Sequence, residues 1–257
     1  MKDLKNRQVA LITGGTKGIG KAIADKLSSK GIQVVVTART APKENTNGHH
    51  FIAADLTQAG SAEKIAKEIV EKYGKLDIIV NNAGANLSPG GGFNELSDEH
   101  WLNDWQLNFM SVVRINKALL PLMLERKNGV IINVSTGAAK LPIWEMTMSY
   151  SSAKAALNAY SKALASEVGP KGIRVNVVSP GVVKTPLMLE FIENIAKSSA
   201  ISSEEAFKIV MDKVGTSLGR MAEPKEIADL VAFLVSSEAS YITGTNYSID
   251  GGALPTV

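Results

Sequence analysis

The 257-residue sequence contains no cysteine, few aromatic residues (5%) and only three histidines. The absence of cysteine excludes disulfide bonds, thiol catalysis and zinc sites built on cysteine. With 28 basic and 25 acidic residues, the net charge is +3, and this small, dispersed excess does not indicate nucleic-acid binding. No run approaches 18 uninterrupted apolar residues, and the first apolar run leads into glycines rather than a cleavage site. We therefore expect a cytoplasmic protein without membrane span or signal peptide.

Short apolar runs alternate along the chain with amphipathic helical stretches. The runs are mostly continuous, as expected for parallel strands covered on both faces. No linker-like segment interrupts the pattern, so we predict one α/β domain over residues 1–257, a Rossmann-type doubly wound parallel sheet of about seven strands with helices on both faces. The predicted strands are 9–12, 34–36, 51–54, 76–80, 130–134, 173–178 and 247–249, and the predicted helices are 19–29, 61–73, 98–125, 149–168 and 224–236.

Three segments depart from this regular pattern. Pro121 is expected to kink or interrupt the helix at 98–125, because proline removes a backbone hydrogen bond. Residues 40–50 are polar and contain proline and glycine, which predicts a loop between the second and third strands. Residues 182–220 contain two helix-like pieces after a Pro-Gly turn, and we expect this segment to be mobile.

A glycine-rich turn follows the first predicted strand and opens the first helix. Its glycines have the spacing Gly-x3-Gly-x-Gly. Glycine lets the backbone approach a phosphate closely, and a helix N-terminus offers that phosphate unpaired N–H groups. The strand–turn–helix context favours dinucleotide binding over a purely structural turn. The candidate cofactor-binding residues here are Gly14, Thr16, Lys17, Gly18, Ile19 and Gly20.

The end of the second strand predicts which dinucleotide binds. NAD-binding chains usually place a carboxylate there to bind the ribose 2′-hydroxyl, but no Asp or Glu lies between Val34 and Lys43. Arg39 and Lys17 are available instead, and both can pair with a 2′-phosphate. The alternative is that both are solvated surface charges. We therefore predict NADP(H) as the cofactor.

Tyr150 and Lys154 are four residues apart at the start of a helical stretch, which places them on one face. A phenol has a pKa near 10, and a neighbouring ammonium is expected to lower it toward the range useful for proton transfer. In an arbitrary helix this spacing more often means a core tyrosine beside a solvated lysine. Here, however, Asn81–Gly84 and the hydroxyls of Ser135 and Thr136 follow other predicted strands, at the sheet edge where ligands bind.

Taken in order, these motifs resemble those of the classical short-chain dehydrogenases/reductases, and the resemblance covers nearly the whole chain. It implies an NADP-dependent enzyme that transfers a hydride between the nicotinamide and a carbonyl or secondary alcohol substrate. The residues that carry it are Thr13 to Gly20, Asp55, Asn81 to Gly84, Asn108, Tyr150 with Lys154, and Ser179-Pro180-Gly181 with Thr185.

The resemblance also implies the roles of individual residues. Tyr150 is the expected general acid or base, and Lys154 is expected to lower its pKa and hold the nicotinamide ribose. Asn108 is expected to organise a water relay that carries protons to solvent. The remaining implied cofactor contacts are Asp55 and Leu56 at the adenine, Asn82, Ala83 and Gly84 alongside the dinucleotide, and Pro180, Gly181, Val183 and Thr185 at the carboxamide end.

One position departs from the family pattern. The family usually places a serine some 13 or 14 residues before the tyrosine, where this chain has Gly137 and Thr136. Ser135 is one residue earlier, and on a strand its side chain would face the opposite way. We assign the catalytic hydroxyl to Thr136 and keep Ser135 as the alternative.

The resemblance further implies a homotetramer or dimer and a small-molecule partner whose pocket is shaped by residues 182–220. Two other functions stay open from the sequence: a catalytically silent nucleotide-binding protein on the same scaffold, and an epimerase or dehydratase of the extended branch of the superfamily. His49 and His50 lack the neighbours of a metal site, so we expect no metal and interpret them as solvated loop residues. Trp144, Met146 and Met148 are either substrate-pocket or packing residues.

Overall fold

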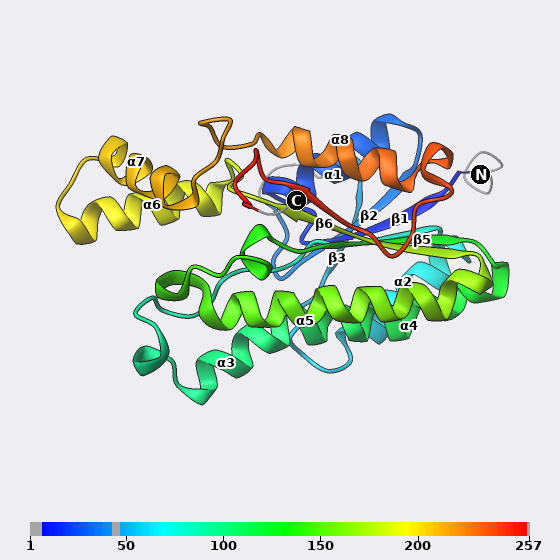
Figure 1. Cartoon of the computed structure of the whole chain (residues 1–257). Coiled ribbons are helices and arrows are strands. Elements are labelled where there is room, and N and C mark those ends of the chain that lie inside the picture. The colour runs from blue at the N-terminus through cyan, green and yellow to red at the C-terminus, as the bar shows by residue number, and fades with distance from the viewer. Residues whose placement is uncertain (1–6, 43–46, 256–257) are drawn as a thin grey trace.

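A computed structural model describes residues 7–42 and 47–255 and contains one seven-stranded parallel sheet (Figure 1). The order β3-β2-β1-β4-β5-β6-β7 confirms the predicted doubly wound fold class. Winding reverses between β1 and β4, and ligands bind in the crevice at such a point. The strands are β1 Val9–Thr13, β2 Gln33–Ala38, β3 His50–Ala53, β4 Ile78–Asn81, β5 Gly129–Val134, β6 Ile173–Pro180 and β7 Asn246–Ile249.

Helices cover both faces of this sheet (Figure 1). On one face α1 packs beside α8, and on the other α4 lies between α2 and α5. The helices are α1 Gly18–Ser29, α2 Ser61–Tyr73, α3 Asp98–Trp105, α4 Ser111–Arg126, α5 Trp144–Val168, α6 Pro186–Ser199, α7 Ser203–Val214 and α8 Pro224–Val235, with a π-helical segment, Gln106–Met110, joining α3 to α4.

The two cores follow from the alternation of side chains along each strand. In β1, Leu11 faces the core formed with α2, α4 and α5, whereas the neighbouring Ile12 faces the core formed with α1 and α8. Both side chains are fully buried. The continuous apolar runs of the sequence therefore correspond to strands that are buried on both faces.

Two helix predictions need correction. Pro121 lies inside α4 without ending it, and the irregularity comes earlier, at the π-helical Gln106–Met110. The side chains of Leu119 and Met123, on either side of the proline, are fully buried, and this packing holds the helix across the missing hydrogen bond. α5 begins at Trp144 rather than at 149 and has non-helical dihedral angles at Thr147, just before the catalytic candidate Tyr150.

In the described part of the chain, one helical stretch, Asp98–Arg126, is long and apolar enough to cross a membrane by length and composition. The core helices of soluble proteins pass the same test. This stretch lies against α2, α5 and β5 within the domain. It therefore matches a core helix.

The segment after β6 forms a helical hairpin of its own. α6 and α7 pack on each other around Ile192, Ala196, Ala206 and Val210, a small core separate from the two main ones. In Figure 1 this hairpin extends beyond the end of the sheet. The two helices predicted within residues 182–220 are thus present.

Candidate active site

The glycine turn lies at the carboxyl end of β1, directly against the end of β4. Asn82 holds the two segments together: its Nδ2 donates to the carbonyl oxygens of Thr13 (3.0 Å) and Gly14 (3.3 Å). Thr13 Oγ1 in turn accepts from the backbone N–H groups of Asn82 and Ala83, both at 3.0 Å. Asn82 and Ala83, predicted to lie alongside the dinucleotide, therefore also shape the turn.

The start of α1 is open to an anion. Lys17, the N-cap residue, is extended and makes no side-chain cap, so the first N–H groups of α1 have no side-chain acceptor there. Gly14 and Gly18 have φ of +65° and +55°, which only glycine adopts without strain. A Cβ on Gly18 would lie 3.2 Å from Thr185 Cγ2, so the turn and Thr185 face one another.

Gly20→Ala is expected to disrupt this cradle. An added Cβ would lie 2.3 Å from the Gly14 carbonyl oxygen and 2.5 Å from Asn82 Nδ2, so the backbone of the turn must move. We expect NADPH affinity to fall by about tenfold or more, with a stability loss of about 1–3 kcal/mol from overpacking. Fluorescence titration with NADPH and thermal unfolding measure both. Gly169→Ala is the control, because an added Cβ there meets no atom within 4 Å and Gly169, like Gly20, is not among the glycines with positive φ. Wild-type affinity in Gly20→Ala would contradict the expectation.

The residues predicted to bind the adenosine half of the cofactor follow β2 and β3. Lys17 and Arg39 are both exposed, and a hydrogen bond from Gly15 N to Thr37 O (3.2 Å) ties the glycine turn to β2. Asp55 Oδ1 accepts from the backbone N–H (3.0 Å) and hydroxyl (2.8 Å) of Thr57, which fixes the turn after β3. Leu56 is buried beside it.

Tyr150 and Thr136 come together at the carboxyl edge of the sheet. Both side chains line the same cavity, and the Thr136 hydroxyl acts on the Tyr150 phenol in the direction that lowers its pKa. Thr136 Oγ1 also accepts from Ala138 N (3.2 Å), which holds this hydroxyl in place. Ser135 points elsewhere: its side chain is buried, and its Oγ has no hydrogen-bond partner among the described residues. The alternation of side chains after β5 thus presents the hydroxyl of Thr136, and not that of Ser135, to the phenol.

Lys154 lies one helical turn after Tyr150 and is only 2% exposed. Its Nζ donates to the carbonyl oxygen of Val134 (2.8 Å), its one hydrogen-bond acceptor among the described residues, so further N–H donors are available for a ligand. A Cβ on Gly84 would lie 3.0 Å from this Nζ and 2.8 Å from Asn108 Oδ1. Gly84 therefore lets the loop after β4 pass between Asn108 and Lys154.

Asn108 occupies the π-helical segment and is fully buried. Its Nδ2 donates to the carbonyl oxygens of Ala85 (2.8 Å) and Asp104 (3.0 Å), and its Oδ1 accepts from Ala85 N (3.1 Å). Such single-turn π-helical insertions are frequent at functional sites. Asn108 thus fixes the loop that carries Gly84, beside Lys154.

Burial dominates the titration of the Tyr150–Lys154 pair. It raises the pKa of Tyr150 to about 12, an effect that the hydrogen bond with Thr136 opposes and the negative charge of Asp104 reinforces. It also lowers the pKa of Lys154 to about 8. The prediction that Lys154 lowers the pKa of Tyr150 is not met in this structure, because desolvation of the phenol raises that pKa. The Lys154 ammonium donates its hydrogen bond to Val134 O instead.

A cavity of about 420 Å³ opens above these residues, within the size range of small-molecule sites. Thr136 and Tyr150 are among its lining residues, and most of the others are apolar. Met146 lines it, whereas Trp144 and Met148 do not. The apolar lining comes from five segments and includes Ala85, Ala138, Leu141, Ile143, Met146, Pro180, Val182, Leu187, Met188, Phe191, Val210, Val214, Ala253 and Leu254.

Comparison with known proteins assigns the family. A family model described as enoyl-(acyl carrier protein) reductase matches residues 14–253. The chain is 36% identical over 251 residues to the 3-oxoacyl-(acyl-carrier-protein) reductase FabG of Haemophilus influenzae, covering 95% of this chain and 97% of that protein. The chain belongs to the classical short-chain dehydrogenases/reductases. It is therefore a member of an oxidoreductase family, as its motifs predicted.

Solved structures similar to this short-chain dehydrogenase/reductase contain a reduced cofactor. A variant of actinorhodin polyketide ketoreductase with NADPH has a TM-score of 0.88 and 34% identity, over 98% of this chain and 99% of that one. The L-sorbose reductase from Gluconobacter frateurii, complexed with NADPH and L-sorbose, has a TM-score of 0.90 and 32% identity, over 98% of both chains.

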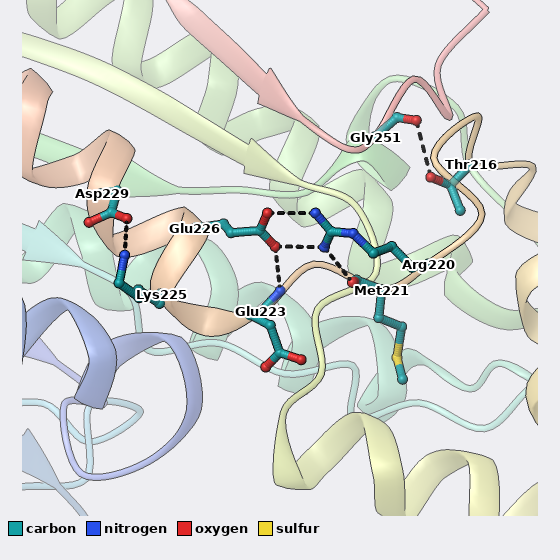
Figure 2. A network of polar contacts seen from close by, with 8 residues as sticks. All are labelled: Thr216, Arg220, Met221, Glu223, Lys225, Glu226, Asp229 and Gly251. Atoms are coloured by element: carbon teal, nitrogen blue, oxygen red, sulfur yellow. Dashed lines mark hydrogen bonds and ion pairs between the residues drawn. The ribbon is translucent and has the colours of Figure 1, made fainter.

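In this short-chain dehydrogenase/reductase, the substrate-side hairpin of α6 and α7 is anchored at both ends. Val183 forms a parallel bridge with Ala222, and Thr185 caps α6 by accepting from Met188 N (3.2 Å). Figure 2 shows the returning end, where Arg220 makes two hydrogen bonds (2.8 and 2.7 Å) to Glu226 at the start of α8. The Arg220 guanidinium and the backbone N–H of Glu223 lower the pKa of Glu226 to about 2.

A second contact joins the hairpin to the opposite wall of the cavity. Lys213, in the last turn of α7, lies 3.1 Å from Glu145, in the first turn of α5. The Lys213 side chain lines the cavity. The hairpin and this ion pair therefore form one wall of the cavity, and the Arg220–Glu226 pair anchors the returning end of the hairpin outside the cavity lining.

The prediction that His49 and His50 are solvated loop residues is wrong. Neither is a solvated loop residue: His49 is buried with Nε2 3.0 Å from Asp25 Oδ1, and His50 begins β3 with its ring 5.8 Å from that of Tyr73. The described residues contain no group of His, Cys, Asp or Glu that could hold a metal ion. These histidines support the fold near the sheet edge.

Sequence reasoning missed Asp104, Ser88 and Ser149. All three are buried or half-buried next to the predicted site, and Ser88 lines the cavity. A sequence signal exists only for Asp104, which lies four residues before Asn108 and therefore on the same helical face. Ser88 and Ser149 belong to segments 61 residues apart, and only the tertiary fold brings them together.

Proposed function

We propose that this chain is an NADPH-dependent reductase that interconverts a carbonyl compound and a secondary alcohol. The observation that supports this most strongly is the Tyr150 phenol paired with Thr136 at the floor of an apolar cavity, one helical turn from the buried Lys154. A phenol, a hydroxyl and an ammonium in this arrangement can bind a carbonyl oxygen and supply it with a proton.

The residues around the crevice fit a dinucleotide. The closely packed Gly14–Gly20 turn leaves backbone N–H groups for the pyrophosphate, and Lys154 has N–H donors for the nicotinamide ribose. Bound nicotinamide would supply the hydride that reduces the carbonyl carbon. We propose that the cofactor is held by Gly14, Thr16, Lys17, Gly18, Ile19, Gly20, Arg39, Asp55, Leu56, Asn82, Ala83, Gly84, Tyr150, Lys154, Pro180, Gly181, Val183 and Thr185.

In this mechanism each protein residue has a separate task. Tyr150 donates its hydroxyl proton to the carbonyl oxygen in reduction and accepts a proton in oxidation. Thr136 hydrogen bonds the same oxygen, and Lys154 positions the nicotinamide ribose through the N–H donors that Val134 O does not occupy. Asn108 fixes the loop at Gly84, and in our proposal it organises the waters that return a proton from solvent.

The cofactor preference follows from charge. Lys17 and Arg39 are exposed at the adenosine end, no carboxylate lies between Val34 and Lys43, and two similar proteins have been solved with NADPH. A 2′-phosphate would pair with the Arg39 guanidinium and the Lys17 ammonium.

The substrate is proposed to be an apolar ketone or 3-oxoacyl compound rather than a polyol. The cavity walls are largely aliphatic and aromatic, whereas a sugar needs hydrogen-bond partners for each buried hydroxyl. We expect faster turnover of a cyclic ketone and a 3-oxoacyl thioester than of L-sorbose, and NADPH consumption with each compound measures this. No turnover with any carbonyl, despite NADPH binding, would favour a catalytically silent protein; label transfer from deuterated NADPH to product would exclude an epimerase.

Thr136→Ala is expected to lower kcat by about 10²-fold, because it removes a donor to the reacting oxygen. Ser135→Ala is the matched control, and we expect a change of less than about threefold, since its buried Oγ has no partner to lose. Steady-state kinetics at neutral pH with the preferred ketone measure both. A larger loss in Ser135→Ala would move the catalytic hydroxyl to Ser135.

We further propose a cytoplasmic homotetramer or dimer. The helix formed by α3, the π-helical segment and α4 exposes Trp101, Leu102 and Trp105 on its outer side, and exposed apolar patches on helices commonly mark subunit contacts. Sedimentation equilibrium gives the oligomeric state directly.

A further inference from the structure

Asp104 is a fully buried acidic residue in the last turn of α3, one helical turn before Asn108. Among the described residues, no Lys, Arg or His lies within ion-pair distance of its carboxylate. Burying a charge without a counter-ion is costly, and such groups concentrate at functional sites. Its position beside the proposed reaction centre therefore needs an explanation.

Hydrogen bonds to both oxygens stabilise this carboxylate. Oδ1 accepts from the backbone N–H of Leu87 (3.0 Å) and from Asn108 Nδ2 (3.4 Å). Oδ2 accepts from the hydroxyls of Ser88 (2.7 Å) and Ser149 (2.6 Å). Ser88 and Ser149 also lie 2.8 Å from each other.

These partners belong to three different walls of the site. Leu87 and Ser88 lie in the loop after β4, Asn108 lies in the π-helical segment, and Ser149 directly precedes Tyr150 on α5. Asp104 is therefore the common acceptor that joins the loop, the π-helical segment and the backbone that carries the phenol. A merely structural link of this kind would not require a charge.

We propose that Asp104 is a positioning residue of the reaction centre: through Ser149 and the loop after β4 it fixes the segment that carries Tyr150, and it places a buried negative charge beside the phenol. This inference rests on the proposed function, because it concerns the proton that Tyr150 transfers. It adds a residue that touches neither the carbonyl oxygen nor the cofactor.

The electrostatic environment of Tyr150 supports this role. Asp104 raises the pKa of Tyr150 by Coulombic interaction, in the same direction as burial. The other charged or titratable groups that face this region are Lys154 on α5, Lys213 from α7 and Asp250 from the C-terminal segment, and His100 lies one turn earlier on α3. Within residues 7–42 and 47–255, Asp104 is the one carboxylate that is hydrogen bonded to Ser149, the residue next to Tyr150.

Asp104→Asn separates the charge from the hydrogen bonds. The asparagine oxygen can still accept from Leu87 N and Asn108 Nδ2, while its Nδ2 can donate to the hydroxyl oxygens of Ser88 and Ser149, which rotate. Only the negative charge is lost. The phenol then ionises at lower pH, since a nearby negative charge no longer disfavours the phenolate.

The test is the pH profile of kcat/KM in both directions. In Asp104→Asn, we expect the alkaline limb of reduction and the acidic limb of oxidation to move to lower pH together, by about half a pH unit or more. Asp98→Asn, the same change at an exposed site of the same helix, is expected to leave both limbs in place. A second neutral variant, Asp104→Ser, guards against a folding defect that is specific to asparagine, and both variants are measured only after thermal unfolding shows a cooperative transition.

The outcomes are distinct. If the pH limbs of reduction and oxidation stay at their wild-type positions in folded Asp104→Asn and Asp104→Ser, the charge role is overturned. Lower activity without a shift of these limbs would leave Asp104 with a structural role only. Absorbance titration of the phenolate, wild type minus Tyr150→Phe, gives the same shift without turnover. If the wild type shows no NADPH-dependent turnover, the proposed function fails, whereas the phenolate titration still reports on Asp104.

Discussion

Tyr150→Phe is expected to lower the rate of carbonyl reduction by about 10²–10⁴-fold, the usual contribution of a positioned general acid. Phenylalanine keeps the ring and removes only the hydroxyl that pairs with Thr136. The affinity for NADPH is expected to change less than the rate, because the Tyr150 hydroxyl is the one proposed cofactor contact that is lost, while the glycine turn and Lys154 are untouched. Single-turnover reduction, monitored by NADPH absorbance, separates the chemical step from binding.

The pH dependence of the wild type provides the companion measurement. Reduction needs protonated Tyr150, so its rate persists through neutral pH and is lost as pH rises toward the phenol pKa, which burial raises to about 12 in the free protein. Because bound, oxidised cofactor adds positive charge nearby, oxidation is expected to ionise the phenol at lower pH than in the free protein. Tyr247→Phe, a tyrosine on β7 outside the cavity lining, is the control. A Tyr150→Phe enzyme with wild-type turnover would end the proposed mechanism.

Arg39→Asp is expected to reverse the cofactor preference. The change removes a partner of the 2′-phosphate and places a carboxylate where NAD-binding chains bind the ribose 2′-hydroxyl. We expect kcat/KM for NADPH to fall by about tenfold or more, as for a lost charged hydrogen bond, and kcat/KM for NADH to rise.

Lys30→Asp tests whether net charge alone explains such a result. It makes the same charge change at an exposed residue that caps the far end of α1, about 18 Å of helix from the glycine turn. Equal kcat/KM for NADPH and NADH in the wild type, or an unchanged ratio in Arg39→Asp, would remove Arg39 from the cofactor site.

Local patterns predicted the fold well because they report local physical chemistry. The apolar run ending at Ile12 and the glycines after it predicted a strand followed by a turn into a helix, and β1 is buried along its whole length. The interruption predicted at Pro121 is absent because burial of Leu119 and Met123 compensates for the one lost hydrogen bond, and this burial cannot be predicted from the proline alone. The histidines at 49 and 50 misled it because polar composition does not reveal a partner such as Asp25.

The features of the candidate site also divide into those that the sequence predicts and those that only the tertiary structure sets. Tyr150 and Lys154 share a helical face by spacing alone, whereas the choice of Thr136 over Ser135 rested on the family's spacing before the tyrosine together with strand alternation. The pKa of Tyr150, by contrast, depends on how completely the phenol is buried and on a carboxylate 46 positions earlier in the chain, at Asp104.

The order of strands, helices and glycines by itself determined the fold class, the family and the residues that meet at the carboxyl edge of the sheet, because periodicity and backbone conformation are properties of short segments. Only the tertiary structure decided the apolar cavity, its enclosure by α6 and α7, and the buried Asp104 network. These depend on desolvation and on contacts between distant segments, and neither is encoded in any local pattern of residues.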